Sequence, residues 1–158
     1  MEGFLDAALS YAKRGWCVFP LVERDKTPAV SGGFTVATVD EEQIRMAWER
    51  RPGMNVAIAT GAMSGGLLVI DLDVHPEKGE DGTDVLWAWE REHGELPETV
   101  TAKTGSGGVH LYYRCNVPVQ CSVNPELGVD VRSDGGYVVA PPSVHPCGGR
   151  YEWDRGPC

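Results

Sequence analysis

The sequence predicts a single α/β (α+β) domain with a mixed, largely antiparallel sheet and flanking helices. Two observations lead to this fold class. The chain has 158 residues, of which 42% are hydrophobic and 23% charged, as in one globular domain with its own core. Short apolar segments bounded by Gly, Pro, Asn and Ser outnumber segments with helical spacing, which favours strands joined by turns. Since no repeat or linker interrupts the pattern, we expect one domain over residues 1–158.

Three segments have the apolar spacing of helices. The first stops at Gly15, a residue type that commonly ends helices. The second begins either at a capping box of Thr38 with Glu41 or at Asp40 as the alternative cap. The helices are expected over residues 4–14, 41–51 and 84–93.

The remaining apolar segments are predicted to be strands. Two pairs are separated by glycine-rich turns, which is typical of β-hairpins: 100–103 with 109–114, and 129–132 with 137–140. The last segment, 150–153, is expected to be an edge strand. The other strands are expected over residues 16–21, 55–60 and 67–73.

The charge of the chain is unevenly distributed. The formal net charge is −9, which by itself argues against a nucleic-acid-binding protein. However, residues 71–98 contain ten acidic and only two basic residues, and the rest of the chain contains thirteen acidic and twelve basic residues. A basic groove outside the acidic segment is therefore compatible with the composition.

The N-terminus does not have the features of a signal peptide. Asp6, Lys13 and Arg14 interrupt its apolar residues, and no apolar run in the chain approaches the length needed to span a membrane. We therefore expect a cytoplasmic protein that does not associate with a membrane.

The five cysteines are scattered and odd in number, which argues against a disulfide framework. Four residues contain metal-ligating atoms that are candidates for zinc. Their spacing matches no standard zinc motif, so we expect that they do not bind zinc. These residues are Cys115, Cys121, His145 and Cys147.

The clearest chemical feature is an Asp-x-Asp pair at the end of an apolar segment. Asp71 and Asp73 follow the run Leu67–Ile70, which is typical of a central strand, and side chains at i and i+2 of a strand share a face. Adjacent carboxylates repel each other unless a cation lies between them. The pair therefore indicates a Mg²⁺ or Mn²⁺ site, and its alternative is two solvated acids at a strand end.

A second feature is the glycine-rich turn Thr104–Gly108, which is followed by His110. Glycines allow backbone amides to approach phosphate oxygens, and the imidazole of His110 can donate a hydrogen bond to a phosphate. The turn contains neither a Walker lysine nor a dinucleotide-binding glycine pattern. The alternative is an ordinary hairpin turn followed by a buried histidine.

A third feature is Asp130, which lies inside the apolar segment Gly128–Arg132. A buried unpaired carboxylate is costly, so Asp130 needs a partner. Arg132, two residues later, either neutralises Asp130 or faces a phosphate while Asp130 binds a metal ion. The sequence leaves both readings open.

The order of these three motifs resembles the archaeo-eukaryotic primase superfamily. The flanking segments narrow the resemblance to the bifunctional primase-polymerase (prim-pol) N-terminal domain of phage and plasmid replication proteins, over nearly the whole chain. The segments that carry the likeness are residues 12–21, Lys26-Thr27-Pro28, 61–66 and 136–143.

The resemblance implies an archaeo-eukaryotic primase-like catalytic domain of the kind that precedes a helical or helicase domain in longer replication proteins. It implies a DNA primase/polymerase that uses single-stranded template, primer and dNTP or NTP. Two divalent ions would be bound by Asp71, Asp73 and Asp130, and these residues with His110 would be catalytic. The superfamily often has a hydroxyl residue where this chain has Gly108. The implied nucleotide-binding residues are Lys103, Ser106, Gly107, Gly108, His110 and Arg132.

Two other functions remain as alternatives. A metal-dependent phosphohydrolase also uses Asp-x-Asp on a strand, but dehalogenase-type hydrolases have Thr where this chain has His75. A non-catalytic nucleic-acid-binding module would not need the carboxylates and the histidine together. Primer extension in the presence of dNTPs and Mg²⁺ or Mn²⁺ would distinguish the three functions.

Overall fold

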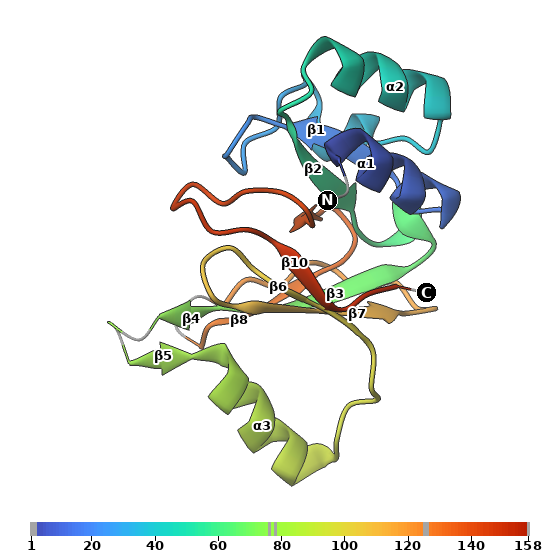
Figure 1. Cartoon of the computed structure of the whole chain (residues 1–158). Helices are drawn as coiled ribbons and strands as arrows, with labels where there is room; N and C mark the ends of the chain where they lie inside the picture. The colour runs from blue at the N-terminus through green and yellow to red at the C-terminus, as the bar shows by residue number, and fades with distance from the viewer. Residues whose placement is uncertain (1–2, 76, 78, 125–126, 158) are drawn as a thin grey trace.

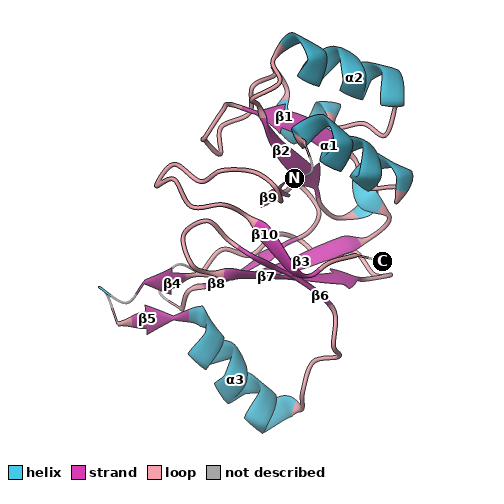
Figure 2. Ribbon diagram, viewed as in Figure 1, coloured by secondary structure: helices cyan, strands magenta, loops and turns pink. Residues whose placement is uncertain are grey.

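The protein is described by a computed structural model, which covers residues 3–75, 77, 79–124 and 127–157. Figures 1 and 2 show that the two larger sheets lie one above the other, with helices on their outer sides, and that β4 (Val74–His75) and β5 (Glu80–Asp81) form a small separate sheet. The upper sheet has the strand order β1-β2-β9, and the lower sheet has the order β10-β6-β7-β3-β8. Every strand pair in both sheets is antiparallel, which agrees with the predicted α+β class.

The elements follow the predicted positions closely. The helices are α1 (Phe4–Lys13), α2 (Glu41–Arg50) and α3 (Gly82–His93), with short 3₁₀ turns η1 (Gly33–Val36) and η2 (Ala62–Ser64). The strands are β1 (Val18–Leu21), β2 (Asn55–Ala59), β3 (Leu67–Leu72), β4 (Val74–His75), β5 (Glu80–Asp81), β6 (Val100–Lys103), β7 (Val109–Arg114), β8 (Val129–Arg132), β9 (Tyr137–Ala140) and β10 (Glu152–Arg155).

Of the two predicted caps of α2, Asp40 is the N-cap. Its carboxylate accepts a hydrogen bond from the Gln43 amide at 3.0 Å, and this satisfies one free donor of the first turn. Thr38 instead accepts from the amide of Asp40. Ile44 and Trp48 then form the buried face of the helix.

The second predicted hairpin is wrong. β8 pairs with β3 in the lower sheet, so that Asp130 lies opposite Asp71, whereas β9 pairs with β2 in the upper sheet, so that Ala140 lies opposite Val56. The turn after Arg132 therefore carries the chain from one sheet to the other. The first predicted hairpin, β6 with β7, is confirmed, and β10 is the expected edge strand.

A continuous core joins the two sheets. Val56 and Ile58 of β2 pack with α1 and α2, and Val69 of β3 and Tyr112 of β7 belong to the same buried cluster. Helix α3 contacts β8 of the lower sheet. In this core, one face of β3 and β7 is held towards β9, and a pocket lies between them.

Among the described residues, none of the helices has both the length and the apolar character needed to cross a bilayer.

Candidate functional site

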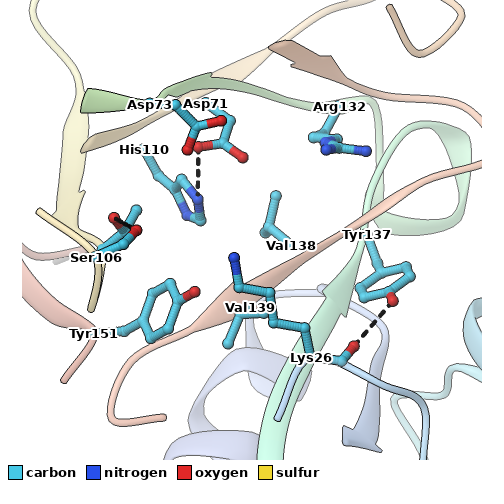
Figure 3. Close-up of a pocket in the computed structure, with 11 residues that line it drawn as sticks. Lys26, Asp71, Asp73, Ser106, His110, Arg132, Tyr137, Val138, Val139 and Tyr151 are labelled. Carbon is cyan, nitrogen blue, oxygen red and sulfur yellow. Dashed lines mark hydrogen bonds and ion pairs between the residues drawn. The ribbon is translucent and has the colours of Figure 1, made fainter. Parts of the chain in front are cut away.

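The pocket lies between the two sheets and is lined by residues from both. The lower sheet and its β6–β7 turn contribute Asp71, Asp73, Thr104, Ser106, His110 and Arg132. The upper sheet contributes Tyr137, Val138 and Val139, and two loops contribute Lys26 and Tyr151. Figure 3 shows the carboxylates, the imidazole and the amine of Lys26 directed into the same space.

Strand register places the predicted catalytic side chains on one face of the lower sheet. Asp71 of β3 lies opposite His110 of β7 on one side and opposite Asp130 of β8 on the other. Directly opposite residues of antiparallel strands share a face, so all three side chains point towards the upper sheet. Asp73 follows two residues after Asp71 and lines the same pocket.

His110 is held by Asp71. The Nε2 atom of His110 lies 3.2 Å from Oδ1 of Asp71, and the exposed fractions of the two side chains are 5% and 17%. On the other side of the ring, Nδ1 lies 3.4 Å from the Tyr112 hydroxyl. The imidazole therefore has a fixed orientation between a carboxylate and a phenol.

The two carboxyls of the Asp-x-Asp pair have opposite pKa shifts. Burial raises the pKa of Asp71, but the hydrogen bond and charge of His110, with smaller contributions from Arg132 and Lys26, bring it below its ordinary value. Burial and the negative charge of Asp71 raise the pKa of Asp73 above its ordinary value. His110 therefore stabilises the ionised form of Asp71. The groups around Asp73 do not offset the free energy needed to ionise it.

This difference predicts opposite effects of two neutral substitutions on metal-free stability. The free energy of unfolding falls as pH rises through the raised pKa of Asp73, and it falls as pH drops through the lowered pKa of Asp71. At neutral pH, Asp73→Asn should keep or raise the melting temperature. Asp71→Asn should lower it by about 2–4 °C, because a charge-assisted hydrogen bond becomes a neutral one.

The measurement is thermal unfolding in EDTA at pH 7, with Glu95→Gln as a control for the loss of an exposed acid. Equal changes in melting temperature for Asp71→Asn and Asp73→Asn would show that His110 does not stabilise the Asp71 carboxylate more than the Asp73 carboxylate.

Asp130 is paired with Arg132. An Nη2 atom of Arg132 lies 2.9 Å from Oδ2 of Asp130, and the amide of Asn124 donates to Oδ1 at 2.8 Å. The Asp130 side chain is 8% exposed, so both of its oxygens are satisfied within the protein. Of the two readings that the sequence left open, the described contacts favour neutralisation of Asp130 by Arg132.

This pairing predicts a thermodynamic coupling between the two residues. Arg132→Ala should lower the free energy of unfolding by about 2 kcal/mol, because it leaves a buried carboxylate without its cation. Adding Asp130→Asn should recover part of that loss, and urea unfolding of the single and double variants measures the coupling. Strictly additive effects would contradict the pairing.

The described residues fit a divalent cation at the Asp71–Asp73 pair. Carboxylate oxygens are the ligands that Mg²⁺ and Mn²⁺ prefer, and the raised pKa of Asp73 is the effect expected where a cation would relieve repulsion. Across the part of the chain that the structure describes, no group of three or more His, Cys, Asp or Glu side chains is arranged around a metal position. Asp130, the predicted third carboxylate, forms an ion pair with Arg132 in the structure.

Of the four zinc candidates, His145 and Cys147 contact each other, and the contacts of Cys115 and Cys121 are with other residues. Cys147 Sγ contacts Nδ1 of His145 at 2.9 Å, whereas Cys121 Sγ accepts from the amide of Ser133. Cys115 Sγ contacts the carbonyl of Val117.

The glycine-rich turn lies at one side of the pocket. Its residue Thr104 closes the turn, because its hydroxyl accepts from the amide of Gly108 at 2.9 Å and lies 3.2 Å from Oγ of Ser106. A Cβ at Gly108 would lie 2.3 Å from the carbonyl oxygen of Leu72. Gly108 is therefore required for close packing of the turn on β3, and this explains why a hydroxyl residue is not found there.

Lys103 is a predicted nucleotide contact that lies outside the pocket. Neighbouring strand residues face opposite sides of a sheet, and Ala102 is the residue that lies opposite His110. The ammonium of Lys103 therefore points to the other face, where it pairs with Asp154 at 3.3 Å.

Six lining residues were not among the predicted site residues: Lys26, Thr104, Tyr137, Val138, Val139 and Tyr151. Burial, with the charges of Asp71 and Asp73, raises the pKa of Tyr151 well above its ordinary value, so its hydroxyl remains protonated as a donor. Sequence signals could have identified several of these residues: the Lys-Thr-Pro segment contains Lys26, the glycine-rich turn begins at Thr104, and the segment 136–143 contains Tyr137, Val138 and Val139.

Comparison with known proteins shows to which family the chain belongs. A family model described as bifunctional DNA primase/polymerase, N-terminal, matches residues 8–158, which is nearly the whole chain. No curated protein matches the chain. The chain belongs to the family of bifunctional DNA primase/polymerase N-terminal domains.

Proposed function

We propose that this domain is a template-directed nucleotidyltransferase that adds nucleotides to the 3′ end of a primer on single-stranded DNA. Its family is one of DNA primase/polymerase domains, and DNA and nucleotides are the substrates that the family suggests. The observation that carries the proposal is the Asp71–Asp73 pair, which faces the same pocket as His110 and Lys26. A phage or plasmid replication protein is the setting that the sequence resemblance suggests.

Divalent ions bound at the carboxylates would polarise the α-phosphate and offset its developing charge, which is the main requirement of phosphoryl transfer. Asp71 and Asp73 would hold the first ion. Asp130 would join a second ion only by releasing Arg132, to which it is bonded in the structure.

The protein side chains have separate roles in this proposal. His110 keeps Asp71 ionised and oriented through its Nε2 contact, and its position beside the pocket allows it to face a phosphate. The hydroxyls of Ser106 and Tyr151 are available as neutral donors in the same pocket. Positioning of the reactants contributes much of the acceleration in such reactions.

The experiment is incubation with a 5′-labelled primer on a longer template, dNTPs and Mg²⁺ or Mn²⁺, with separate detection of pyrophosphate and orthophosphate. The proposal expects primer extension with one pyrophosphate released per nucleotide added. Orthophosphate release without extension would indicate the phosphohydrolase, and DNA binding without turnover would indicate a non-catalytic module.

A further inference from the structure

Lys26 reaches the pocket from the other half of the molecule. It lies in the loop between β1 and η1, which belongs to the upper sheet, whereas the carboxylates belong to the lower sheet. Figure 3 shows its side chain extending along β9 with the amine directed into the pocket, towards Asp71 and Asp73. Lys26 is thus the cation on the wall that faces the carboxylate pair.

The backbone around Lys26 is held in place by side chains from two strands. The Tyr137 hydroxyl of β9 donates to the carbonyl of Lys26 at 3.0 Å, and Asn55 of β2, which is 1% exposed, donates to the carbonyl of Asp25 at 3.0 Å. The Asp25 carboxylate accepts from the amides of Lys26 and Thr27 at 2.6 and 3.1 Å. An exposed lysine on a loop braced in this way is fixed at its base, as a binding residue requires.

The same loop contains an unusual backbone conformation. Arg24 has a φ of 55°, and within the described part of the chain it is the one residue other than glycine with a positive φ. Such a conformation is uncommon and persists where the surrounding structure enforces it, often at a functional site. This supports a loop shaped to place Lys26 but does not identify its ligand.

The charges in the pocket identify the class of ligand. In the described residues, no carboxylate lies within ion-pair distance of the Lys26 amine, whereas Arg132 is already bonded to Asp130. An unpaired ammonium therefore faces two carboxylates that themselves favour a divalent cation. A ligand that binds to both walls of the pocket needs negative charge to pair with the ammonium of Lys26 and further oxygen atoms to bind the divalent cation. A polyphosphate has both.

We propose that Lys26 is a catalytic residue that binds the β- and γ-phosphates of the incoming nucleotide; this inference rests on the proposed function. In that reaction the primer 3′ oxygen bonds to the α-phosphorus, the bond from the α-phosphorus to the bridging oxygen breaks, and the hydroxyl proton passes to solvent. Pyrophosphate leaves with the negative charge that the bridging oxygen gains. With the α-phosphate beside Asp71 and Asp73, the two distal phosphates extend to the opposite wall, where the ammonium of Lys26 binds them.

The test is equilibrium dialysis of labelled dATP and labelled dAMP with Mg²⁺ and without DNA, so that it does not depend on turnover. Lys26→Ala should weaken dATP binding at least about tenfold, which corresponds to about 1.4 kcal/mol, and should change dAMP binding by less than about twofold. Lys26→Arg should remain within about threefold of wild type for dATP, because it keeps the charge. Lys13→Ala, which removes an exposed lysine at the end of α1, is the control and should change neither affinity.

Tyr137→Phe gives a second test, because it removes the hydroxyl that holds the carbonyl of Lys26 and leaves the ammonium in place. It should weaken dATP binding by about threefold without weakening dAMP binding, as the loss of one neutral hydrogen bond implies. Thermal unfolding of each variant verifies that it is folded.

Unchanged dATP binding by folded Lys26→Ala would overturn the inference, and so would an equal loss of dATP and dAMP. If wild type extends primers while Lys26→Ala binds dATP normally, the inference fails and the proposed function stands. If wild type binds dATP through Lys26 but extends no primer, the proposed function fails and Lys26 remains a polyphosphate-binding residue.

Discussion

Asp71→Asn and Asp73→Asn are each expected to reduce primer extension at least about a hundredfold, or about 2.7 kcal/mol of transition-state stabilisation. Both carboxylates face the pocket, and an amide cannot supply the negative charge that a divalent cation needs. Primer-template affinity should change by less than about threefold, since these acids repel DNA rather than bind it. The measurement is single-turnover extension at saturating primer-template.

Glu95→Gln, which neutralises an exposed acid in the same acidic segment, is the matched control and should keep wild-type activity. Near-full activity of Asp71→Asn with Mg²⁺ would show that the carboxylate pair does not take part in catalysis.

His110→Ala is expected to lower kcat/KM for the dNTP by about a hundredfold. The substitution removes the side chain that holds Oδ1 of Asp71, and it removes the imidazole that we propose to face the phosphates of the nucleotide. We expect KM for the dNTP to rise and kcat to fall, while DNA affinity is unchanged. Steady-state kinetics at several dNTP concentrations separates the two parameters.

His110→Gln keeps a side-chain donor and should recover part of the activity, and His93→Ala, which alters an exposed histidine of α3, should have no effect. A loss of DNA affinity with unchanged dNTP kinetics would assign His110 to template binding instead.

Most individual elements were predictable because the signals for them are local. The apolar run before Asp71 predicts the central strand β3, and Asp40 and Gly15 mark helix boundaries where the structure has them. The predicted hairpin of β8 with β9 failed for the opposite reason. The Ser133–Gly136 turn has the composition of a hairpin turn, but turn chemistry does not specify which strands the flanking segments join. Hydrogen bonding with β3 and β2, which are distant in sequence, decides their pairing.

The candidate site was predictable where one strand carries its residues. Asp71 and Asp73 are two residues apart, and Arg132 lies two residues after Asp130. Strand periodicity therefore predicts that the two side chains of each pair lie on the same face of the sheet. Periodicity could not tell whether Lys103 or Ala102 faces the pocket, because that depends on the pairing with β7. Periodicity also could not predict that Lys26 and Asp71 line the same pocket, since this proximity arises only when the two sheets pack together.

The most direct test of the central claim, that the pocket of Asp71 and Asp73 joins nucleotides under the direction of a template, is single-nucleotide incorporation. Wild type is given one dNTP at a time on four templates that differ only in the first unpaired base. We predict that the primer grows by one nucleotide with the complementary dNTP, that mismatched dNTPs give at most a small fraction of this rate, and that Asp71→Asn gives none. Growth that ignores the template base, or no growth while orthophosphate accumulates, would contradict the account.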